Sequence, residues 1–538
     1  MVALKYIEYV LFALLYGTSL FAYSNAMTDT FIVGKWCYTL LVLTVCLFIV
    51  AIIRFCFPSS SGWGKQHDKT VVFLCCMIVF ISFCQTLYGL GQWLHCFPSN
   101  GRYRMTGSFD NPAGFAASLV AVFPFILYCR KSMTVFAVRC ILSLVALLTI
   151  LAILLSCSRS GLTAVVVMGG WMLYRKSSLK PLSKRLLAIL VLTIFMVGVY
   201  FLKKDSADGR LLIWRCSWDM IKESLLTGWG WNAFRAHYMD YQAAYFECHP
   251  NSVYAMLADN VQSPFNEFLS FLLCFGIIGV LFLSVAIFLL FRFCQCNRIE
   301  PIKQTAVCAL LGIAVFSFFS YPFTYPSVWI LFAFCIYVLI KDCVSYKPSR
   351  GMERVCFIFF ALCAVFLGGK VCQRIHAEYK WKKVAYVPME KDLPVYADLY
   401  SILGKDPYFL YNYAFARFRC GHLDEGLTLA LECRSLWADY DLEVLLGTIY
   451  MRKKEYRQAE LHYIKASFMC PCRFIPLYQL FCLYKEQGNE SLAYDFAKRI
   501  EAKEVKVSST TVKQIKYKVK LYMREHCKQM ERKNYEGT

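Results

Sequence analysis

The stretch Leu142 to Leu155 reads LSLVALLTILAILL and contains no charged residue, and Ile277 to Phe291 is just as apolar. Such runs recur through residues 1–370. Over the whole chain 58% of residues are hydrophobic and 17% are charged, and the mean hydropathy is +0.47. A soluble domain has about 25% charged residues, and about 20 consecutive apolar residues suffice for a helix to cross a bilayer. The sequence therefore predicts a membrane protein with many spanning helices.

The apolar runs place about eleven spanning helices in residues 1–370. We expect them at residues 5–24, 36–57, 70–91, 112–129, 136–156, 160–175, 185–202, 265–292, 304–321, 325–341 and 354–370. No small-residue cleavage site follows the first run, so Val10 to Tyr23 is expected to belong to a retained helix and not to a signal peptide. The predicted fold is all-α, with a polytopic membrane helix bundle in residues 1–370.

The formal net charge is +22, from 58 Lys and Arg against 36 Asp and Glu. Many basic residues lie in connections on alternate sides of the predicted spans, at residues 58–69, 130–131, 175–185, 292–303 and 341–354. Because short loops rich in Lys and Arg remain in the cytoplasm, we expect the other connections on the opposite side. These include a long loop of residues 203–263, and an odd number of spans places residues 371–538 there too. The charge therefore indicates orientation in a lipid bilayer and not a nucleic-acid partner.

The 27 cysteines lie mostly inside apolar runs, where cysteine behaves as a small hydrophobic residue. No Cys/His set has the spacing of a zinc site, and no Gly-rich phosphate loop of the Walker type is present. Asp439 and Asp441 form a D-x-D pattern, but they lie between two expected helices, so we interpret the pattern as chance. We expect no metal and no cofactor, and a disulfide between Cys470 and Cys472 stays open.

Residues 371–538 form a water-soluble tail in which apolar residues recur at helical spacing between charges. Residues 446–471, LGTIYMRKKEYRQAELHYIKASFMCP, resemble the tetratricopeptide consensus, although Glu443 stands where a Trp usually precedes the Leu-Gly pair. Looser copies lie about 34 residues before and after it, at Ala414 to Gly426 and at Leu480 to Ala493. We predict a helical solenoid of the tetratricopeptide type, with an arbitrary helical bundle as the alternative.

Polar stretches on the side of the long loop stand out from the apolar background. Arg104 to Pro112, RMTGSFDNP, leads into a helix for which Asn111 is the expected cap. Ser156 to Gly161, SCSRSG, puts Arg159 in a tight turn between two predicted spans. The first of these segments is a candidate for binding an anion, because a helix start leaves backbone N–H groups free.

The long loop is the third such stretch. It carries Gly209-Arg210 and Trp214, then LTGWG at residues 226–230. It ends at Ser263 to Leu269, SPFNEFL, where the next span begins. Its motifs therefore lie on the same side as the other two segments.

Three arginines, Arg104, Arg159 and Arg210, share this side of the membrane. They could converge on a phosphate, because a guanidinium binds phosphate through two parallel hydrogen bonds. The alternative is that each arginine is simply solvated at the membrane surface.

The order of these motifs resembles that of the O-antigen ligase superfamily. The series is R-x-T-G-S-F-x-N-P, S-x-S-R-S-G, G-R-x-x-x-W, L-x-G-x-G and N-E-x-L, followed by a helix that contains Phe275 to Gly279, FGIIG. The similarity covers residues 100–285, and the superfamily includes O-antigen polymerases and bacterial protein O-oligosaccharyltransferases. A tetratricopeptide tail is similar to what many of its members carry.

The resemblance implies a metal-independent membrane glycosyltransferase or ligase. It would transfer a glycan from undecaprenyl pyrophosphate to an acceptor hydroxyl of a glycolipid, glycan or protein, at the periplasmic face of the bacterial inner membrane. The tail would dock the acceptor or a protein partner. Family arginines that hold the pyrophosphate correspond to Arg159 and Arg210, with Arg104 as a further candidate. Cationic side chains can replace a metal, because neutralising its charge makes the pyrophosphate a good leaving group.

The supporting motif residues are Asn111, Trp214 and Asn266, but one family residue is missing. The family usually has a His before the Asn of the loop–helix motif, proposed to activate the acceptor, and here that position is Phe265. We expect Glu267, on the first turn of the following helix, to act as the base. His249 is the second candidate, and His237 lies farther back in the same loop.

Two other functions stay open at the level of sequence. A transporter or flippase for the same lipid-linked glycan would also need many spans, but it predicts charges inside them. Most predicted spans carry almost none, and Glu8 is a rare exception. A non-catalytic membrane scaffold built around the repeats is the other alternative, because the family His is absent.

Overall fold

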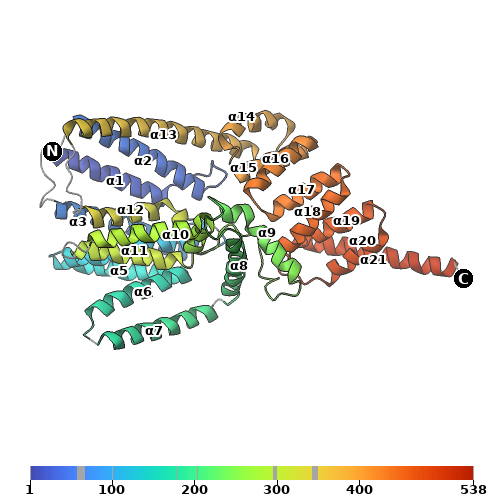
Figure 1. Cartoon of the computed structure of the whole chain (residues 1–538), viewed down its shortest axis with the longest axis horizontal. Coiled ribbons are helices and arrows are strands. Elements are labelled where there is room, and N and C mark those ends of the chain that lie inside the picture. The colour runs from blue at the N-terminus through green and yellow to red at the C-terminus, as the bar shows by residue number, and fades with distance from the viewer. Residues whose placement is uncertain are drawn as a thin grey trace. The chain divides into compact units, whose positions relative to one another are not determined.

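The structure is a computed structural model of the chain. It describes residues 2–56, 67–99, 101–178, 180–202, 204–294, 300–341 and 349–536. Every regular element within these residues is a helix (Figure 1), which confirms the all-α prediction for this part of the chain. The basic connections expected at residues 58–69, 292–303 and 341–354 lie partly outside the described residues.

The contacts of the chain divide it into two compact units. The first comprises residues 1–202, 265–268 and 281–383, and the second comprises residues 203–264, 269–280 and 384–538. The helices of the first unit are α1 (Val2–Phe21), α2 (Ile32–Cys56), α3 (His67–Trp93), α4 (Pro112–Ser132), α5 (Phe136–Leu155), α6 (Arg159–Lys176), α7 (Pro181–Leu202), α11 (Pro301–Ser317), the short η1 (Pro322–Thr324), α12 (Pro326–Ile340) and α13 (Arg350–Val384). Helix α10 (Glu267–Cys294) contributes residues to both units.

Within the part of the chain that the structure describes, six helices are long and apolar enough to cross a membrane. They are Ile32–Cys56, Thr70–Trp93, Pro112–Ser132, Phe136–Leu155, Glu267–Leu290 and Gly351–Val384. Three shorter apolar helices, Tyr6–Phe21, Pro301–Ser317 and Pro326–Ile340, coincide with other predicted spans. These helices confirm the prediction of a multi-pass membrane protein, while the count of about eleven spans stays a prediction.

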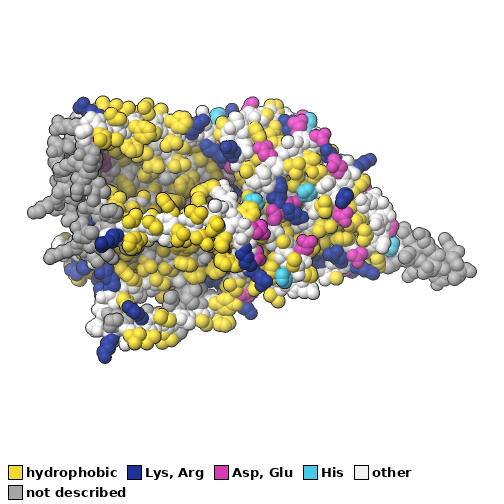
Figure 2. Space-filling model, in the orientation of Figure 1, with side chains coloured by type: hydrophobic (Ala, Val, Ile, Leu, Met, Phe, Trp, Pro, Cys, Tyr) yellow, Lys and Arg dark blue, Asp and Glu magenta, His cyan; other side chains and the backbone are white. Residues whose placement is uncertain are grey.

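Helix α4 is the centre of the first unit. It packs against α3, α5, α6, α11 and α12, and its side chains from Phe115 to Ile126 are buried. By contrast, the apolar side chains of α13 and most of α10 are exposed. Figure 2 shows hydrophobic side chains covering the visible surface of α1, α2 and α13. An apolar surface of this kind suits contact with lipid.

Helix α13 continues past residue 370, where the tail was expected to begin. Its later residues remain in the first unit, which extends to Lys383. Glu378 is buried there and accepts hydrogen bonds from Thr28 Oγ1 (2.8 Å) and Arg374 Nη2 (2.6 Å). This polar contact joins the end of α13 to the connection between α1 and α2.

Helix α10 is broken at Gly276, where the sequence predicted one uninterrupted span. Gly276 has φ 60° and ψ −166°, a conformation essentially restricted to glycine. The backbone of residues 225–230 fills the break. Four hydrogen bonds join the two segments, from the N–H of Trp229 to the carbonyl of Leu273 (2.9 Å), Gly230 to Cys274 (3.0 Å), Ile277 to Leu225 (2.9 Å) and Ile278 to Leu226 (3.1 Å). These bonds pair backbone groups that the break in the helix would otherwise leave without a partner.

Two glycines allow these backbones to meet. A Cβ on Gly276 would lie 2.2 Å from the carbonyl oxygen of Leu226, and a Cβ on Gly228 would lie 2.5 Å from the carbonyl carbon of Cys274. Both distances are far below van der Waals contact. The LTGWG and FGIIG motifs therefore have a joint structural role, which is to hold the break in α10.

The second unit contains the loop and the tail. Where the sequence predicted a long loop, there are two helices, α8 (Lys204–Glu223) and α9 (Ala233–Cys248). The tail comprises η2 (Glu390–Asp392), α14 (Leu393–Leu403), α15 (Pro407–Arg419), α16 (Leu423–Leu436), α17 (Tyr440–Arg452), α18 (Tyr456–Met469), α19 (Ile475–Glu486), α20 (Glu490–Ala502) and α21 (Thr510–Glu536). Consecutive helices pack in pairs, α15 on α16, α17 on α18 and α19 on α20 (Figure 1).

Small and aromatic residues allow the two helices of a pair to pack closely together. In the pair α17/α18, an added Cβ on Gly447 would lie 2.6 Å from the Tyr463 ring. Leu446, Ala459 and Ala466 are fully buried beside them. Acidic and basic side chains are mixed over the visible surface of the tail helices (Figure 2), in contrast to the apolar helices of the first unit.

Candidate functional site

The RMTGSFDNP segment is held by polar side chains of α2 and α3. Gln92 Oε1 accepts the N–H groups of Thr106 (3.0 Å) and Gly107 (2.8 Å). Lys35 is completely buried, and its Nζ lies 3.4 Å from Ser108 Oγ. Gln92 thus fixes the backbone of this motif, and Lys35 contacts its Ser108 side chain. Neither residue was among the predicted site residues.

Asn111 caps α4, as predicted. Its Oδ1 accepts the N–H of Gly114 (2.9 Å), and its Nδ2 donates to the hydroxyls of Tyr321 (3.2 Å) and Tyr325 (3.0 Å). The Tyr325 hydroxyl donates to Asp110 Oδ1 (2.9 Å). Burial raises the pKa of Asp110 above its ordinary value, while the hydrogen bonds from Tyr325 and Asn111 act in the opposite direction. The start of α4 is therefore tied to the turn between α11 and α12.

The SCSRSG segment reaches the same turn. Ser158 caps α6, and Arg159, which is half-buried, is the first residue of that helix. The neighbouring Ser160 Oγ donates to the carbonyl of Phe319 (3.1 Å). Cys157 has φ 53°, a left-handed conformation that costs a non-glycine residue about 1 kcal/mol. This strained turn lies two residues before Arg159 and directly precedes the cap of α6.

The SPFNEFL segment contacts the turn as well. Glu267 Oε1 accepts the N–H of Phe323 (3.3 Å) at the start of α10. Phe265, in the position of the family His, has φ 53°, and its ring packs against that of Tyr321 with 5.4 Å between the centroids. The Phe at this position therefore packs against an aromatic residue of the turn.

Residues 319–325, which we call the hub turn, thus bind three motif segments of the first unit. The contacts come from Asn111, Ser160 and Glu267, whose positions in the chain are far apart. Backbone carbonyl, backbone N–H and tyrosine hydroxyl groups of the turn all take part. The hub turn consequently brings Glu267 and the residue beside Arg159 into one neighbourhood.

Arg104 lies elsewhere on the first unit. It is exposed, its guanidinium packs over the Trp93 ring at 5.7 Å, and its Nη2 lies 3.3 Å from His95 Nε2. Trp93 is the last residue of α3, and His95 lies in the turn that follows it. The arginine is therefore placed by the same helix that supplies Gln92 to the motif.

Asn266, in the first unit, is half-buried directly before α10. Arg210, Trp214, His249 and His237 belong to the second unit. Arg210 is half-buried on α8, and Trp214 Nε1, one turn later, donates to the carbonyl of Pro264 (2.9 Å). His249 is exposed at the end of α9 and stacks on the Tyr245 ring at 4.7 Å. His237 stacks on Trp229 at 4.8 Å, and burial lowers its pKa.

Tyr321 and Tyr325, the two tyrosines of the hub turn, were not among the predicted site residues. They stand at the ends of the predicted spans 304–321 and 325–341. The sequence does carry a signal for them, because each precedes a proline in the series YPFTYP. Two polar aromatic residues at the ends of predicted spans, each followed by a helix-starting proline, indicate a defined turn.

Among the residues that the structure describes, no group of three or more His, Cys, Asp or Glu side chains is arranged to hold a metal ion. The described site is instead built from amides, hydroxyls, carboxylates and arginines.

Residues 113–284 match the model of a protein family described as O-antigen ligase. A comparison with curated proteins gives no match. The matched segment contains Arg159, Arg210, Trp214, His249, Asn266 and Glu267. Arg104 and Asn111 precede it. The match supports the resemblance to the O-antigen ligase superfamily, and a domain of that family implies a membrane enzyme of the ligase or glycosyltransferase type.

Proposed function

We propose that this protein transfers a glycan from undecaprenyl pyrophosphate to an acceptor hydroxyl at the periplasmic face of the bacterial inner membrane. The observation that carries the proposal is the meeting of three motif segments at the hub turn. Two of these segments lie inside the stretch that matches O-antigen ligase. A site built from separate loops on one scaffold is typical of a binding or catalytic centre.

In the proposed reaction the acceptor oxygen attacks the anomeric carbon of the glycan. The bond from that carbon to the pyrophosphate oxygen breaks, and undecaprenyl pyrophosphate leaves with the electron pair. Arg159, Arg210 and Arg104 neutralise the pyrophosphate, which stabilises the charge that develops on it without a metal ion. Asn111, Trp214 and Asn266 orient the segments that carry these groups.

Glu267 is the proposed base, and it takes the proton of the acceptor hydroxyl. The hydrogen bond from the Phe323 N–H and the position at the start of α10 support this role, because both fix the carboxyl group. His249 is the alternative base. It is exposed, and its Nδ1 lies 2.9 Å from the carbonyl of Tyr245.

In this proposal the chain has about eleven spans, with the loop of residues 203–263 and the tail in the periplasm. The tail is a tetratricopeptide solenoid that docks the acceptor or a protein partner. The pairwise packing of α15 to α20 supports this assignment, since stacked helix pairs are the units of such solenoids.

Deletion of the gene tests the proposed function and separates its versions. A lipid-linked glycan should accumulate, and the product that receives it should disappear. Accumulation of complete repeat units without long chains would identify a polymerase, and accumulation of long chains would identify a ligase. Loss of glycan from a protein would identify a protein glycosyltransferase. Unchanged lipid-linked, polysaccharide and glycoprotein profiles would contradict the proposal.

The variants Glu267→Gln and His249→Gln distinguish the two candidate bases. Removing the carboxylate at position 267 should lower kcat about 100-fold, because a positioned base contributes on this scale. His249→Gln should retain most of the activity. The measurement is the steady-state rate of glycan transfer by purified protein. The reverse order of the two effects would assign the base to His249.

A further inference from the structure

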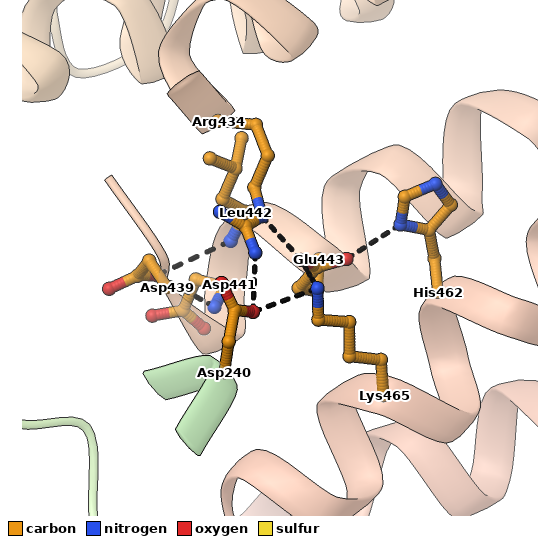
Figure 3. Close-up of polar contacts among 8 residues, drawn as sticks. All are labelled: Asp240, Arg434, Asp439, Asp441, Leu442, Glu443, His462 and Lys465. Atoms are coloured by element: carbon orange, nitrogen blue, oxygen red, sulfur yellow. Dashed lines mark hydrogen bonds and ion pairs between the residues drawn. The ribbon is translucent and has the colours of Figure 1, made fainter. Parts of the chain in front are cut away.

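The loop and the tail are joined inside the second unit by ionic contacts at their interface. Helix α9 of the loop packs against α16 and α18 of the tail. Asp240 on α9 lies 2.5 Å from Arg434 Nη2 and 2.8 Å from Lys465 Nζ. Figure 3 shows Asp240 on the ribbon of α9 pointing toward these two cations.

A second carboxylate, Glu443 on α17, organises the tail side of this contact. Its side chain is 1% exposed and lies 2.6 Å from Arg434 Nε, 2.6 Å from His462 Nδ1 and 3.5 Å from Lys465 Nζ (Figure 3). Burial alone raises the pKa of Glu443, but the hydrogen bond from His462 and the charges of Lys465 and Arg434 together lower it to about 2. Glu443 therefore stays ionised and holds the two cations that bind Asp240.

The position of Glu443 is the one at which the repeat consensus has a Trp. An acidic residue at a core position is costly unless it is paired. Here it is paired with cations that also bind the loop, so this departure from the repeat pattern marks the place where the loop attaches. Asp439, part of the apparent D-x-D, has a related role, because its carboxylate caps α17 and accepts a hydrogen bond from Asn260 of the loop (2.6 Å).

Further contacts between loop and tail extend from residue 235 to residue 262. They are four hydrogen bonds. The N–H of Ala438 donates to the carbonyl of Arg235 (3.0 Å), and Gln242 Nε2 donates to the carbonyl of Met469 (2.6 Å). Arg473 Nη2 donates to Asp259 Oδ1 (2.7 Å), and Trp437 Nε1 donates to Gln262 Oε1 (3.1 Å). The tail therefore contacts both α9 and the segment that follows it.

Helix α9 in turn supports α8. The two helices pack together, and the Tyr241 hydroxyl donates to Glu223 Oε2 (2.5 Å). Trp229, between the helices, donates from Nε1 to the carbonyl of Met220 (2.9 Å). An unbroken series of contacts thus leads from the tail through α9 to the helix that carries Arg210.

We propose that the tail holds the loop in place for glycan transfer. The tail binds α9 through the contacts of Asp240, Arg434 and Glu443, and α9 in turn positions α8 and its Arg210. The link to transfer rests on the proposed function. The three residues are positioning residues, because they act on the reaction through α9 and α8.

The test compares Asp240→Arg with Asp219→Arg in the full-length protein. At position 240 the new arginine adds a third cation beside Arg434 and Lys465 and should release α9. Asp219 pairs with Lys222 on the surface of α8, and its side chain is 49% exposed, so the same change there spares the interface. Asp240→Glu keeps the charge and should retain the wild-type behaviour. If D240R does not accumulate in the membrane, the Asp240→Asn variant replaces it in the same test.

Two measurements are made on each variant. Limited trypsin digestion follows cleavage of the loop after Arg215, Lys222 and Arg235, and a transfer assay gives kcat and KM for the lipid-linked donor. D240R should be cleaved about tenfold faster, because the released loop opens more often. Its kcat/KM should fall about tenfold or more, because the arginine is misplaced.

Unchanged cleavage in D240R would overturn the proposal, and so would faster cleavage with unchanged kcat/KM. Equal effects in D219R would also overturn it, because they would show a response to charge and not to the interface. A wild-type protein without transfer activity would count against the proposed function, and the digestion would then still decide whether the tail holds the loop.

Discussion

Replacing Arg210 by alanine is expected to lower the rate of glycan transfer about 1000-fold, the scale on which a group that stabilises developing charge acts. Arg210 is half-buried on α8, inside the stretch that matches O-antigen ligase. In the proposed reaction its guanidinium binds the leaving pyrophosphate. The alanine variant loses both hydrogen bonds and the charge, so the leaving group becomes poorer. The measurement is transfer from a polyprenyl-pyrophosphate donor by purified protein, with the membrane content of each variant determined by immunoblot.

Arg215→Ala is the matched control for this experiment. Arg215 lies on the same helix, is exposed, and packs over the Tyr245 ring at 5.3 Å. Its removal changes the net charge equally but should leave the transfer rate close to that of the wild type. The transfer rate of the Arg210→Lys variant should lie between the rates of the two alanine variants. The reason is that an ammonium group neutralises charge but cannot bind phosphate through a planar fork. Undiminished transfer by the Arg210→Ala variant would contradict the assigned role.

Replacing Gly276 by alanine is expected to cost several kcal/mol of stability and to reduce the amount of folded protein in the membrane. The backbone at Gly276 lies in a region that other residues avoid, and the new Cβ would lie 2.2 Å from the Leu226 carbonyl oxygen. The chain would have to separate the two segments and lose hydrogen bonds that fill the break in α10. Thermal unfolding of the purified protein in detergent and its yield from membranes measure the effect.

Gly169→Ala is the control for this substitution. Gly169 lies within α6, and an added Cβ would have no atom within 4 Å. Since alanine favours a helix by about 1 kcal/mol over glycine, this variant should be unchanged or slightly more stable. A Gly276→Ala variant as stable as the control would show that α10 does not need the break.

The first turn of α4 illustrates what could be predicted from sequence. Asn111 was expected to cap the helix and Pro112 to begin it, and both do so. The reason is that a cap depends on residues within three positions of each other. The apolar runs were predictable for a similar reason, because the length and composition of one segment decide whether it can span a bilayer.

The long loop shows what the sequence left open. Residues 203–263 were predicted as a connection between two spans, without helices of its own, and they contain α8 and α9. Buried residues such as Leu212, Cys216 and Phe246 recur along these helices. They alternate with charged and polar groups, so neither segment resembles a membrane span. A search limited to long apolar runs passes over such amphipathic helices.

The division between an apolar body and a polar tail was therefore determined by the sequence itself, because it depends on composition along one stretch of chain. The family resemblance could also be seen there, since short motifs in order carry it. The tertiary structure decided the rest: the hub turn, the break at Gly276, and the pairing of Asp240 with Arg434. Each of these joins residues separated by about 50 to 200 positions, and loop closure over such distances leaves no local pattern in the sequence. Glu443 shows the difference most clearly, because it interrupts a repeat in the sequence but holds the loop and tail together in the structure.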